Sequence, residues 1–395
     1  MSVSESLRPH LDRIQRMSLI LGAIGLAGCA GGYFVDHTQL LRSYLWAYIF
    51  WCGISLGSLG ALLLHNTVGG KWGVVIHNLA ETACSPKMFV VFFILLIPIL
   101  LNIGILYPWA FPEAAKDPVI QHKVGYLNVP FFVGRAVLYF AIWILYGAIL
   151  GRVSKRIDET GDEALVIKTR QISAPGLVVV TFACTFAFFD WVMSLEPHWY
   201  STIYGLMFLI GMVLAAFCFI ISMLVLAWAN DRTVAEYVTP QHFHDLGNMV
   251  FAFTNLWAYL SVSQFIIIWS GNLPDEIPWY LRRFHGGWGW VAVFLCVFHF
   301  AVPFVLLLHR GVKRNARVLV MVCVGLFAVR MLNEYWLVEP GFFGQGMHFS
   351  WMDIATGLFF GGLWVYLFMA QIKQKSILPM NDPRLAEAPQ ETVAA

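Results

Sequence analysis

The chain alternates long apolar stretches with short polar segments. The ten apolar stretches fall near residues 17–35, 44–64, 88–108, 129–150, 175–195, 203–229, 247–270, 287–308, 318–338 and 351–371. Each is close to the roughly 20 residues that a helix needs to cross a bilayer. Because a helix satisfies its own backbone hydrogen bonds in lipid, the pattern predicts an all-α integral membrane protein with ten transmembrane helices.

Composition agrees with this prediction. Hydrophobic residues make up 59% of the 395 residues and charged residues only 12%, whereas about 25% of the residues in a soluble domain are charged. The net charge of +2 gives no indication of a nucleic-acid partner and is compatible with membrane lipids as the surroundings. No small-residue cleavage site follows the first apolar stretch, so we expect a retained helix rather than a signal peptide.

The charges of the polar segments predict the orientation. An even number of spans places both termini on one side of the membrane. The segments on that side hold 18 of the 25 Lys and Arg residues, against 5 on the other side and 2 within the spans. The positive-inside rule then makes both termini cytoplasmic. We therefore expect a cytoplasmic segment at 1–16, a membrane domain at 17–371 and a cytoplasmic tail at 372–395, of which 381–395 would be disordered.

The seven cysteines predict neither a disulfide framework nor a metal site. None forms a C-x-x-C pair, and all except Cys84 lie within apolar stretches. Such cysteines are usually small buried hydrophobes. The chain also lacks phosphate-binding, dinucleotide-binding and zinc-protease motifs. We therefore expect this chain itself to bind no redox cofactor and no metal.

Ionisable side chains at membrane depth are costly and mark candidate functional sites. Most of those in this chain gather toward the predicted outer side, namely Arg135, Asp190, Glu196, His198, Arg330, Glu334 and Asp353. Two interpretations are open. The cluster is either an internal network of ion pairs that fixes helix registers, or a proton relay or quinone head-group site.

The ninth span carries Arg330, Asn333 and Glu334 three and four residues apart. This spacing places all three on one helix face. Such a polar face must turn toward the bundle interior or a wet cavity rather than toward lipid.

The end of the fifth span sets the surroundings of three further candidates. The proline that follows Glu196 predicts that the helix has ended by that residue. Glu196 and His198 would then lie at an aqueous mouth. Asp190 would stay inside the bundle, either as a proton carrier or as the salt-bridge partner of Arg135 or Arg330.

The eighth span carries His299, with His285 fourteen residues before it. On one continuous helix the two histidines would share a face and could bind two stacked haems. No other span carries a matching pair, so we favour a core histidine and keep His299 as a proton-path candidate. Pro303 cannot donate a hydrogen bond to the preceding turn, which predicts a kink or a bound water near His299.

A second set of polar residues lies on the predicted cytoplasmic side. They are His65, His77, Glu81, His242, His244 and Asp245. These residues are the candidates for a proton entrance from the cytoplasm. For Asp245 we favour a structural interpretation, because it suits the N-cap position of the seventh span.

Two long stretches resemble a known family. They are DWVMSLEPHWYSTIYG, residues 190–205, and HFHDLGNMVFAFTNLWAYLSVSQFIIIWSGNLPDEIPWYLRRFHGGW, residues 242–288. Together with ten spans and cytoplasmic termini, they resemble the NrfD-like membrane subunits of bacterial alternative complex III over nearly the whole chain. The resemblance implies two four-helix bundles, formed by spans two to five and six to nine, with spans one and ten peripheral.

The resemblance also implies a function in quinol oxidation. Complexes of this family oxidise membrane quinol and pass the electrons through iron–sulfur clusters and c-type haems on partner subunits. The expected partners are the NrfD-like sister subunit ActC, an iron–sulfur subunit, c-type cytochrome subunits and a terminal oxidase, in the bacterial inner membrane. This chain would serve respiratory electron transport as a scaffold and in proton translocation, and quinone or quinol is the cofactor that it could meet.

Two other functions stay open. A stand-alone secondary transporter of the inner membrane would show inverted repeats with broken helices that meet at mid-membrane. The prolines Pro98 and Pro303 fall in spans three and eight and form no obvious pair of interruptions. A membrane cytochrome would need histidine pairs on more than one span. The subunit of a redox complex is therefore the leading prediction.

Overall fold

The computed structural model describes residues 3–343 and 346–386. Within these residues every regular element is a helix, and ten spans are long and apolar enough to cross a membrane, as predicted. The spans are α1 (Arg8–Val35), α2 (His37–Val68), α4 (His77–Ala83) with α5 (Pro86–Leu101), α8 (Val129–Thr160), α9 (Glu163–Trp191), α10 (Tyr204–Asn230), α12 (Pro240–Gly271), α14 (Trp288–Leu295) continued by the π-helix η4 (Cys296–Ala301) and α15 (Val302–Leu308), α17 (Ala316–Val338) and α18 (Trp351–Ile372).

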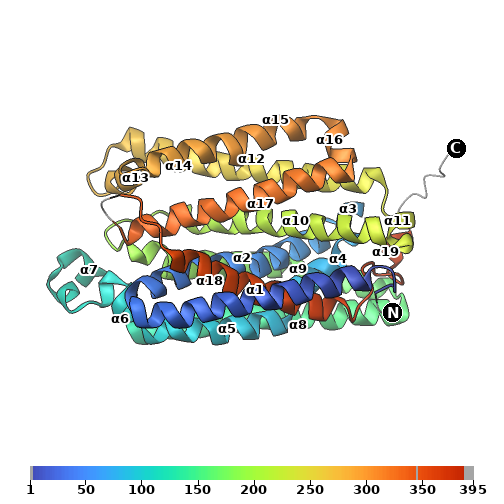
Figure 1. Ribbon diagram of the computed structural model, residues 1–395, viewed down its shortest axis with the longest axis horizontal. Coiled ribbons are helices and arrows are strands. Elements are labelled where there is room, and N and C mark those ends of the chain that lie inside the picture. Colours follow the sequence, from blue (N-terminus) through green and yellow to red (C-terminus); the bar gives the residue numbers. More distant parts are fainter. Residues whose placement is uncertain (1–2, 344–345, 387–395) are drawn as a thin grey trace.

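Short helices lie at the two ends of the spans. They are α3 (Lys71–Val74), α6 (Ile103–Leu106), α7 (Pro118–Lys123), α11 (Arg232–Tyr237), α13 (Ile277–Phe284), α16 (Arg310–Arg314), α19 (Pro383–Ala386) and the 3₁₀ turns η1 (Pro108–Ala110), η2 (Pro112–Lys116), η3 (Met193–Leu195) and η5 (Glu339–Gly341). Figure 1 shows that α1 begins at the end of the molecule where α18 stops and α19 lies. This end is termed the terminal end below, and the other the opposite end.

Eight spans form two four-helix bundles, as the resemblance implies. The first contains α2, α5, α8 and α9, and the second contains α10, α12, α14–α15 and α17. The bundles meet where α2 lies against α10, and these two helices are the most buried of the spans. α1 and α18 pair with each other and lie against α2 (Figure 1). α1 is largely exposed, whereas 61% of the most apolar stretch of α18 is buried.

Side-chain caps determine where several spans begin. Asp36 separates α1 from α2 and accepts a hydrogen bond of 2.9 Å from the backbone amide of Gln39. Asn128 caps α8 in the same way, and Ser350 with Asp353 forms a capping box at the start of α18. Each cap satisfies amides that have no partner within their helix. The polar residues between apolar stretches therefore define the turns of the chain.

Several spans extend past the apolar stretches that predicted them. α1 begins at Arg8, so much of the segment predicted as a cytoplasmic extension at 1–16 is helical. α8 continues to Thr160 rather than ending near residue 150. A helix satisfies its own backbone on both sides of the hydrocarbon boundary. Hydrophobicity therefore marks the membrane but not the helix ends.

The C-terminal tail is partly folded, which corrects the expectation of disorder from residue 381. Residues 381–386 include α19, and its Leu385 is buried. Burial acts to raise the pKa of Asp382, but hydrogen bonds and the charge of Arg384 outweigh it and lower that pKa below its ordinary value. The buried Leu385 and a hydrogen bond of 2.7 Å from the Asn381 side chain to the carbonyl of Asp158 hold the segment in place, which composition alone does not reveal. The remainder of the predicted disorder, at 387–395, lies outside the described residues.

Glycines allow α1 and α18 to approach to backbone contact. A Cβ atom on Gly25 would lie 2.2 Å from the amide nitrogen of Phe359, and one on Gly362 would lie 2.4 Å from the Cα atom of Gly22. Helices in lipid often associate through small residues, because the hydrophobic effect does not drive helix pairing there. The α1–α18 pair therefore depends on these positions.

We predict that Gly362→Val lowers the free energy of unfolding by about 1–3 kcal/mol, because the added methyl groups push α1 away from α18. Gly31→Val on α1 is the matched control, since no heavy atom of another residue lies within 4 Å of a Cβ atom placed there. Denaturation in detergent micelles measures both variants. Equal stability of the two would contradict the close packing.

Candidate functional site

A bidentate ion pair joins α8 to α9 inside the first bundle. Arg135 donates two hydrogen bonds of 2.8 Å to the carboxylate of Asp190. Tyr139, one turn along α8, donates a third at 2.8 Å. The guanidinium also donates to the carbonyl of Tyr126 at 2.9 Å and lies over the rings of Tyr126 and Phe131. Both charged groups are buried.

This geometry determines the partner of Asp190. Of the two arginines open from the sequence, the structure pairs it with Arg135 and not with Arg330. Bidentate arginine–carboxylate pairs combine strong hydrogen bonds with a defined orientation. Three donors engage the carboxylate, so the pair serves as a structural link between α8 and α9.

A second polar group lies inside the second bundle, on α17. Arg330 donates to Asn333 and Glu334 on the next turn of its own helix, and all three are buried, as their spacing predicts. The guanidinium packs so closely on Gly211 of α10 that a Cβ atom there would collide with it. Among the described residues, Arg330 Nε and Glu334 Oε2 have no hydrogen-bond partner. Buried polar atoms of this kind are normally bonded to water.

His299 lies in the same bundle, in η4, which packs against α12 and α17. Its ring is fully buried, with 3.8 Å between its centroid and that of the Trp257 ring. Neither ring nitrogen has a hydrogen-bond partner in the part of the chain that the structure describes. Pro303 has no backbone N–H to donate to the preceding turn, and the chain adopts the π-helix η4 at this point. π-helical turns within α-helices are frequent at functional sites.

His285 does not lie on this span. It follows α13 and is exposed, and α14 begins only at Trp288. Gly286 and Gly287 both have positive φ, and this turn separates α13 from α14, and with it His285 from His299. The two histidines therefore do not share a helix face, as a pair of stacked haems would require. All seven cysteines are free, and the described residues contain no group of three His, Cys, Asp or Glu placed to hold a metal ion.

At the opposite end, Glu196 and His198 have different partners. Glu196 lies beyond the end of α9, as predicted, but it is buried and forms ion pairs with Arg282 at 2.8 Å and Arg283 at 2.9 Å. His198 is exposed and contacts Asp117, the N-cap of α7, at 2.7 Å. Desolvation acts to raise the pKa of Asp117, but hydrogen bonds from His198 and from backbone amides lower it below its ordinary value. Both residues therefore tie loops together.

Asp353 also has structural partners. Within the capping box of α18 it accepts a hydrogen bond of 2.8 Å from the amide of Ser350. It also accepts from the hydroxyls of Ser43 at 2.5 Å and Tyr335 at 2.9 Å. These bonds attach the start of α18 to α2 and α17.

Sequence reasoning missed Glu339. This residue follows α17 in η5 and is fully buried, and neither carboxylate oxygen has a hydrogen-bond partner among residues 3–343 and 346–386. The proline after it indicates a loop, but the apolar residues directly before it are a signal that it continues the span. Along the helix axis Glu339 lies about 7.5 Å beyond Glu334. Five residues correspond to about 140° around the helix, so Glu339 faces a different side of α17 from the Arg330–Glu334 pair.

At the terminal end, the predicted entrance residues form two groups. In the first bundle the rings of His65 and His77 lie 6.3 Å apart. His77 hydrogen-bonds Ser154 of α8 at 3.2 Å, and Glu81 lies 2.5 Å from Lys375. Neither nitrogen of His65 has a partner within the described chain. This group is bounded by α8 and by the segment after α18.

The second group, His242, His244 and Asp245, lies on α12. Thr239 and His242 form a capping box, so α12 begins before Asp245, and the N-cap prediction for Asp245 is wrong. A threonine followed by a proline is a strong helix start, and it precedes the acid by several residues. Asp245 instead accepts a hydrogen bond of 2.8 Å from Gln241, one turn earlier.

Comparison with known proteins gives no further guide to function. No protein-family model matches the chain, and no curated protein is significantly similar to it. The function is therefore inferred from the residues and their arrangement.

We predict that Asp190→Asn lowers the free energy of unfolding by about 3–5 kcal/mol, because it leaves the buried Arg135 without its counter-charge. The double variant Arg135→Met, Asp190→Leu should lose less, since it buries no unpaired charge. Asp275→Asn, at an exposed position, is the control. Denaturation in detergent micelles measures all three. A single variant as stable as the control would show that the pair is not a structural link.

Proposed function

We propose that the chain is a membrane subunit of a quinol:cytochrome c oxidoreductase, an ActF-type member of the NrfD-like family in bacterial alternative complex III. The proposal is supported by the two long motifs at 190–205 and 242–288 and by the ten spans around them. The terminal end would face the cytoplasm of a bacterial cell, because that side holds 18 of the 25 Lys and Arg residues.

Within such a complex the chain would act as a scaffold and as a path for protons. One observation carries the proton path. His299, Arg330 and Glu334 are buried in the second bundle, and each has a polar atom without a partner among the described residues. Such groups can bind water and mark proton relays in membrane proteins. Asp190 of the first bundle is engaged by its donors, so that bundle suits the scaffold.

The proposed path runs along α17 toward the opposite end. Arg330 and Glu334 lie on one face of α17, about 6 Å apart along the helix axis, in the bundle that holds His299. Bridging waters between these groups and His299 would pass a proton onward. On the terminal side, His244 is a predicted entrance residue that belongs to the same bundle.

Electron transfer would belong to the partner subunits. Oxidation of a quinol releases protons together with electrons. The electrons would pass to iron–sulfur clusters and c-type haems on ActC-associated partners, and then to a cytochrome or a terminal oxidase.

The opposite end of this chain exposes large aromatic side chains, including Tyr200 and Trp290. Aromatic residues are enriched at protein interfaces, so this end is the proposed docking surface.

A stand-alone secondary transporter is the second candidate. The observation that favours it is η4, an interruption of a span beside the buried His299, because transporters place broken helices at their binding sites. However, α2 and α10 both run from the opposite end to the terminal end (Figure 1), so the two bundles repeat in parallel and not in inverted order.

Purification of the tagged chain in mild detergent distinguishes these candidates. We expect it to carry with it subunits that contain c-type haem, identified by mass spectrometry and by the reduced-minus-oxidised spectrum, together with quinol:cytochrome c activity. A colourless chain that purifies alone and takes up solute in proteoliposomes would contradict the proposal.

For the proton path, we predict that His299→Gln leaves the partner subunits and the haem spectrum unchanged but lowers quinol-driven turnover about 100-fold, the usual size of a lost proton-transfer group. The ring has no protein partner among the described residues, so its replacement breaks no ion pair. His122→Gln, at an exposed position of the short helix α7, is the control. Normal turnover and proton release in His299→Gln would remove His299 from the path.

A further inference from the structure

A charged groove lies along the first turns of α1, at the terminal end of the molecule. Its volume is about 790 Å³, and all of its lining residues belong to the segment 5–20. Arg8, Arg13 and Arg16 line it, and all three side chains are exposed. Met17 and Ile20 continue the lining and are exposed as well. The groove thus combines positive charge with apolar surface.

Helical spacing places the two kinds of side chain one above the other. Arg13 and Arg16 are three residues apart and share a helix face. Met17 follows Arg13 by four residues and adjoins it on this face. Ile20 follows Arg16 by the same interval. From the terminal end inward, the groove therefore presents charge first and apolar surface second.

The groove carries an excess of positive charge. Two acids line it as well, Glu5 and Asp12. However, the carboxylate of Asp12 lies 2.6 Å from the ammonium group of Lys373, which supplies its counter-charge. Glu5 is then the acid of the described lining that opposes the three arginines. The groove therefore suits an anionic ligand.

The depth of the groove indicates what kind of anion fits. The first apolar stretch begins at Met17, and Arg13 precedes it by about 6 Å along the helix axis. The polar layer on each side of a hydrocarbon core is about 5–8 Å thick. Arg13 and Arg16 thus lie at the level of the lipid phosphates. Met17 and Ile20 lie at the level where the acyl chains begin.

We propose that this groove binds an anionic glycerophospholipid, with the phosphate group held by Arg13 and Arg16. The acyl chains would lie along Met17 and Ile20. Guanidinium groups bind phosphate oxygens through charge-assisted and often bidentate hydrogen bonds. Basic residues beside the membrane end of a helix also attract anionic leaflets. The bound lipid would hold the start of α1, a largely exposed helix, at the membrane surface.

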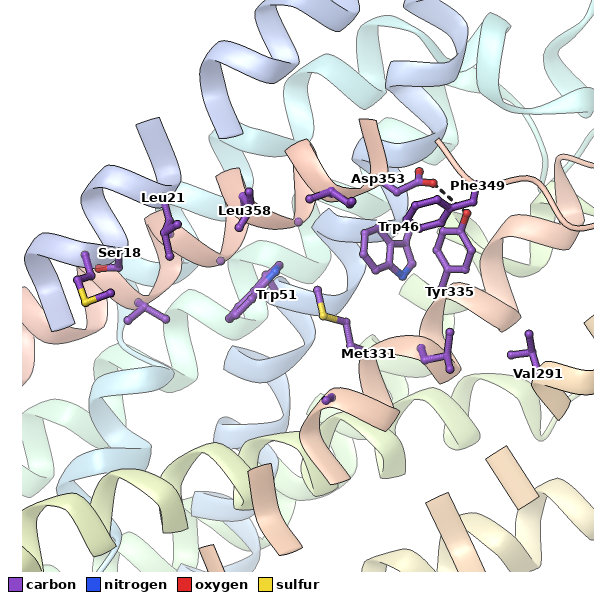
Figure 2. A pocket seen from close by; sticks show the side chains of 18 of the residues that line it. Ser18, Leu21, Trp46, Trp51, Val291, Met331, Tyr335, Phe349, Asp353 and Leu358 are labelled. Atoms are coloured by element: carbon purple, nitrogen blue, oxygen red, sulfur yellow. Dashed lines mark hydrogen bonds between the residues drawn. The ribbon is translucent and has the colours of Figure 1, made fainter. Parts of the chain in front are cut away.

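The wider pocket that adjoins this groove gives no such indication of a ligand. It lies between the α1–α18 pair and the second bundle, has a volume of about 920 Å³ and shares Met17 with the groove. Figure 2 shows Ser18 and Leu21 of α1 at one end of it and Tyr335 of α17 at the other. The charged residue of its described lining, Asp353, is negative and is bonded to Tyr335. The lipid phosphate is therefore assigned to the groove at 5–20 alone.

Native mass spectrometry of the full chain, delipidated in detergent, tests this site. Dioleoylphosphatidylglycerol is the anionic probe and dioleoylphosphatidylcholine the zwitterionic reference. We expect the double variant Arg13→Gln, Arg16→Gln to bind the anionic lipid about 30-fold more weakly, at about fivefold for each basic residue near an anionic lipid surface. Glu5→Gln should bind it more tightly, by about the factor of a single arginine, because it removes the opposing charge.

Arg310→Gln, Arg317→Gln is the matched control. Both arginines are exposed and lie at the terminal end, in α16 and at the start of α17, but neither lines the groove. Unchanged affinity in this control, with the loss in Arg13→Gln, Arg16→Gln, would support the site. An equal loss in both double variants would overturn it, because positive charge anywhere at the terminal end would then suffice.

Two further outcomes would overturn the site. One is equal binding of the two lipids by the wild type. The other is binding of inorganic phosphate as tightly as the anionic lipid, because a free anion would then be the ligand. The site requires neither a redox partner nor a quinol, so it can fail without the proposed function, and the proposed function without it.

Discussion

A charge buried in hydrocarbon needs a counter-charge within the protein, and this constraint organises both bundles. A lone arginine at the centre of a span costs several kcal/mol at least. Both buried arginines of the spans accordingly have a carboxylate partner, Arg135 on the neighbouring helix and Arg330 on its own. An interhelical pair fixes two helices relative to each other. An intrahelical pair holds only its own turn and leaves other polar atoms facing the interior.

The two bundles therefore differ in how firmly their helices are linked to one another. In the first bundle, hydroxyl groups add further links: Tyr44 and Tyr48 of α2 donate to carbonyls of α5 at 2.7 and 3.1 Å, and Tyr107 donates to the carbonyl of Trp191 at 3.1 Å. The second bundle instead combines a π-helix with the buried His299, Arg330 and Glu334, whose polar atoms are not all engaged by described residues. In the first bundle the ionisable groups in that state, His65 and His77, lie at the terminal end. A rigid frame on one side and a hydratable interior on the other is an arrangement suited to a protein that must hold partners and move a small charged species.

The sequence predicts those features that depend on local spacing. A run of about 20 apolar residues has few alternatives to a membrane span, so all ten spans are confirmed. Helical spacing likewise places Arg330 and Glu334 on one face. The choice of Arg135 as the partner of Asp190 required the packing of α8 on α9, which no spacing encodes. Glu339 was missed because Pro340, directly after it, predicts an exposed loop, whereas tertiary packing buries the residue.

The pairing of α1 with α18 joins the first helix of the chain to the last. Lys373 contacts Asp12 at a sequence separation of 361 residues, and glycines bring the two backbones together. A ribosome adds roughly 5–20 residues per second, so the first helix waits roughly 20–70 s for its partner to be synthesised. During that interval its glycine face has only lipid as a neighbour. The first helix to enter the membrane is thus among the last to pair with its neighbour. Biogenesis factors that shield newly made helices would have to bind this N-terminal helix for longer than any other.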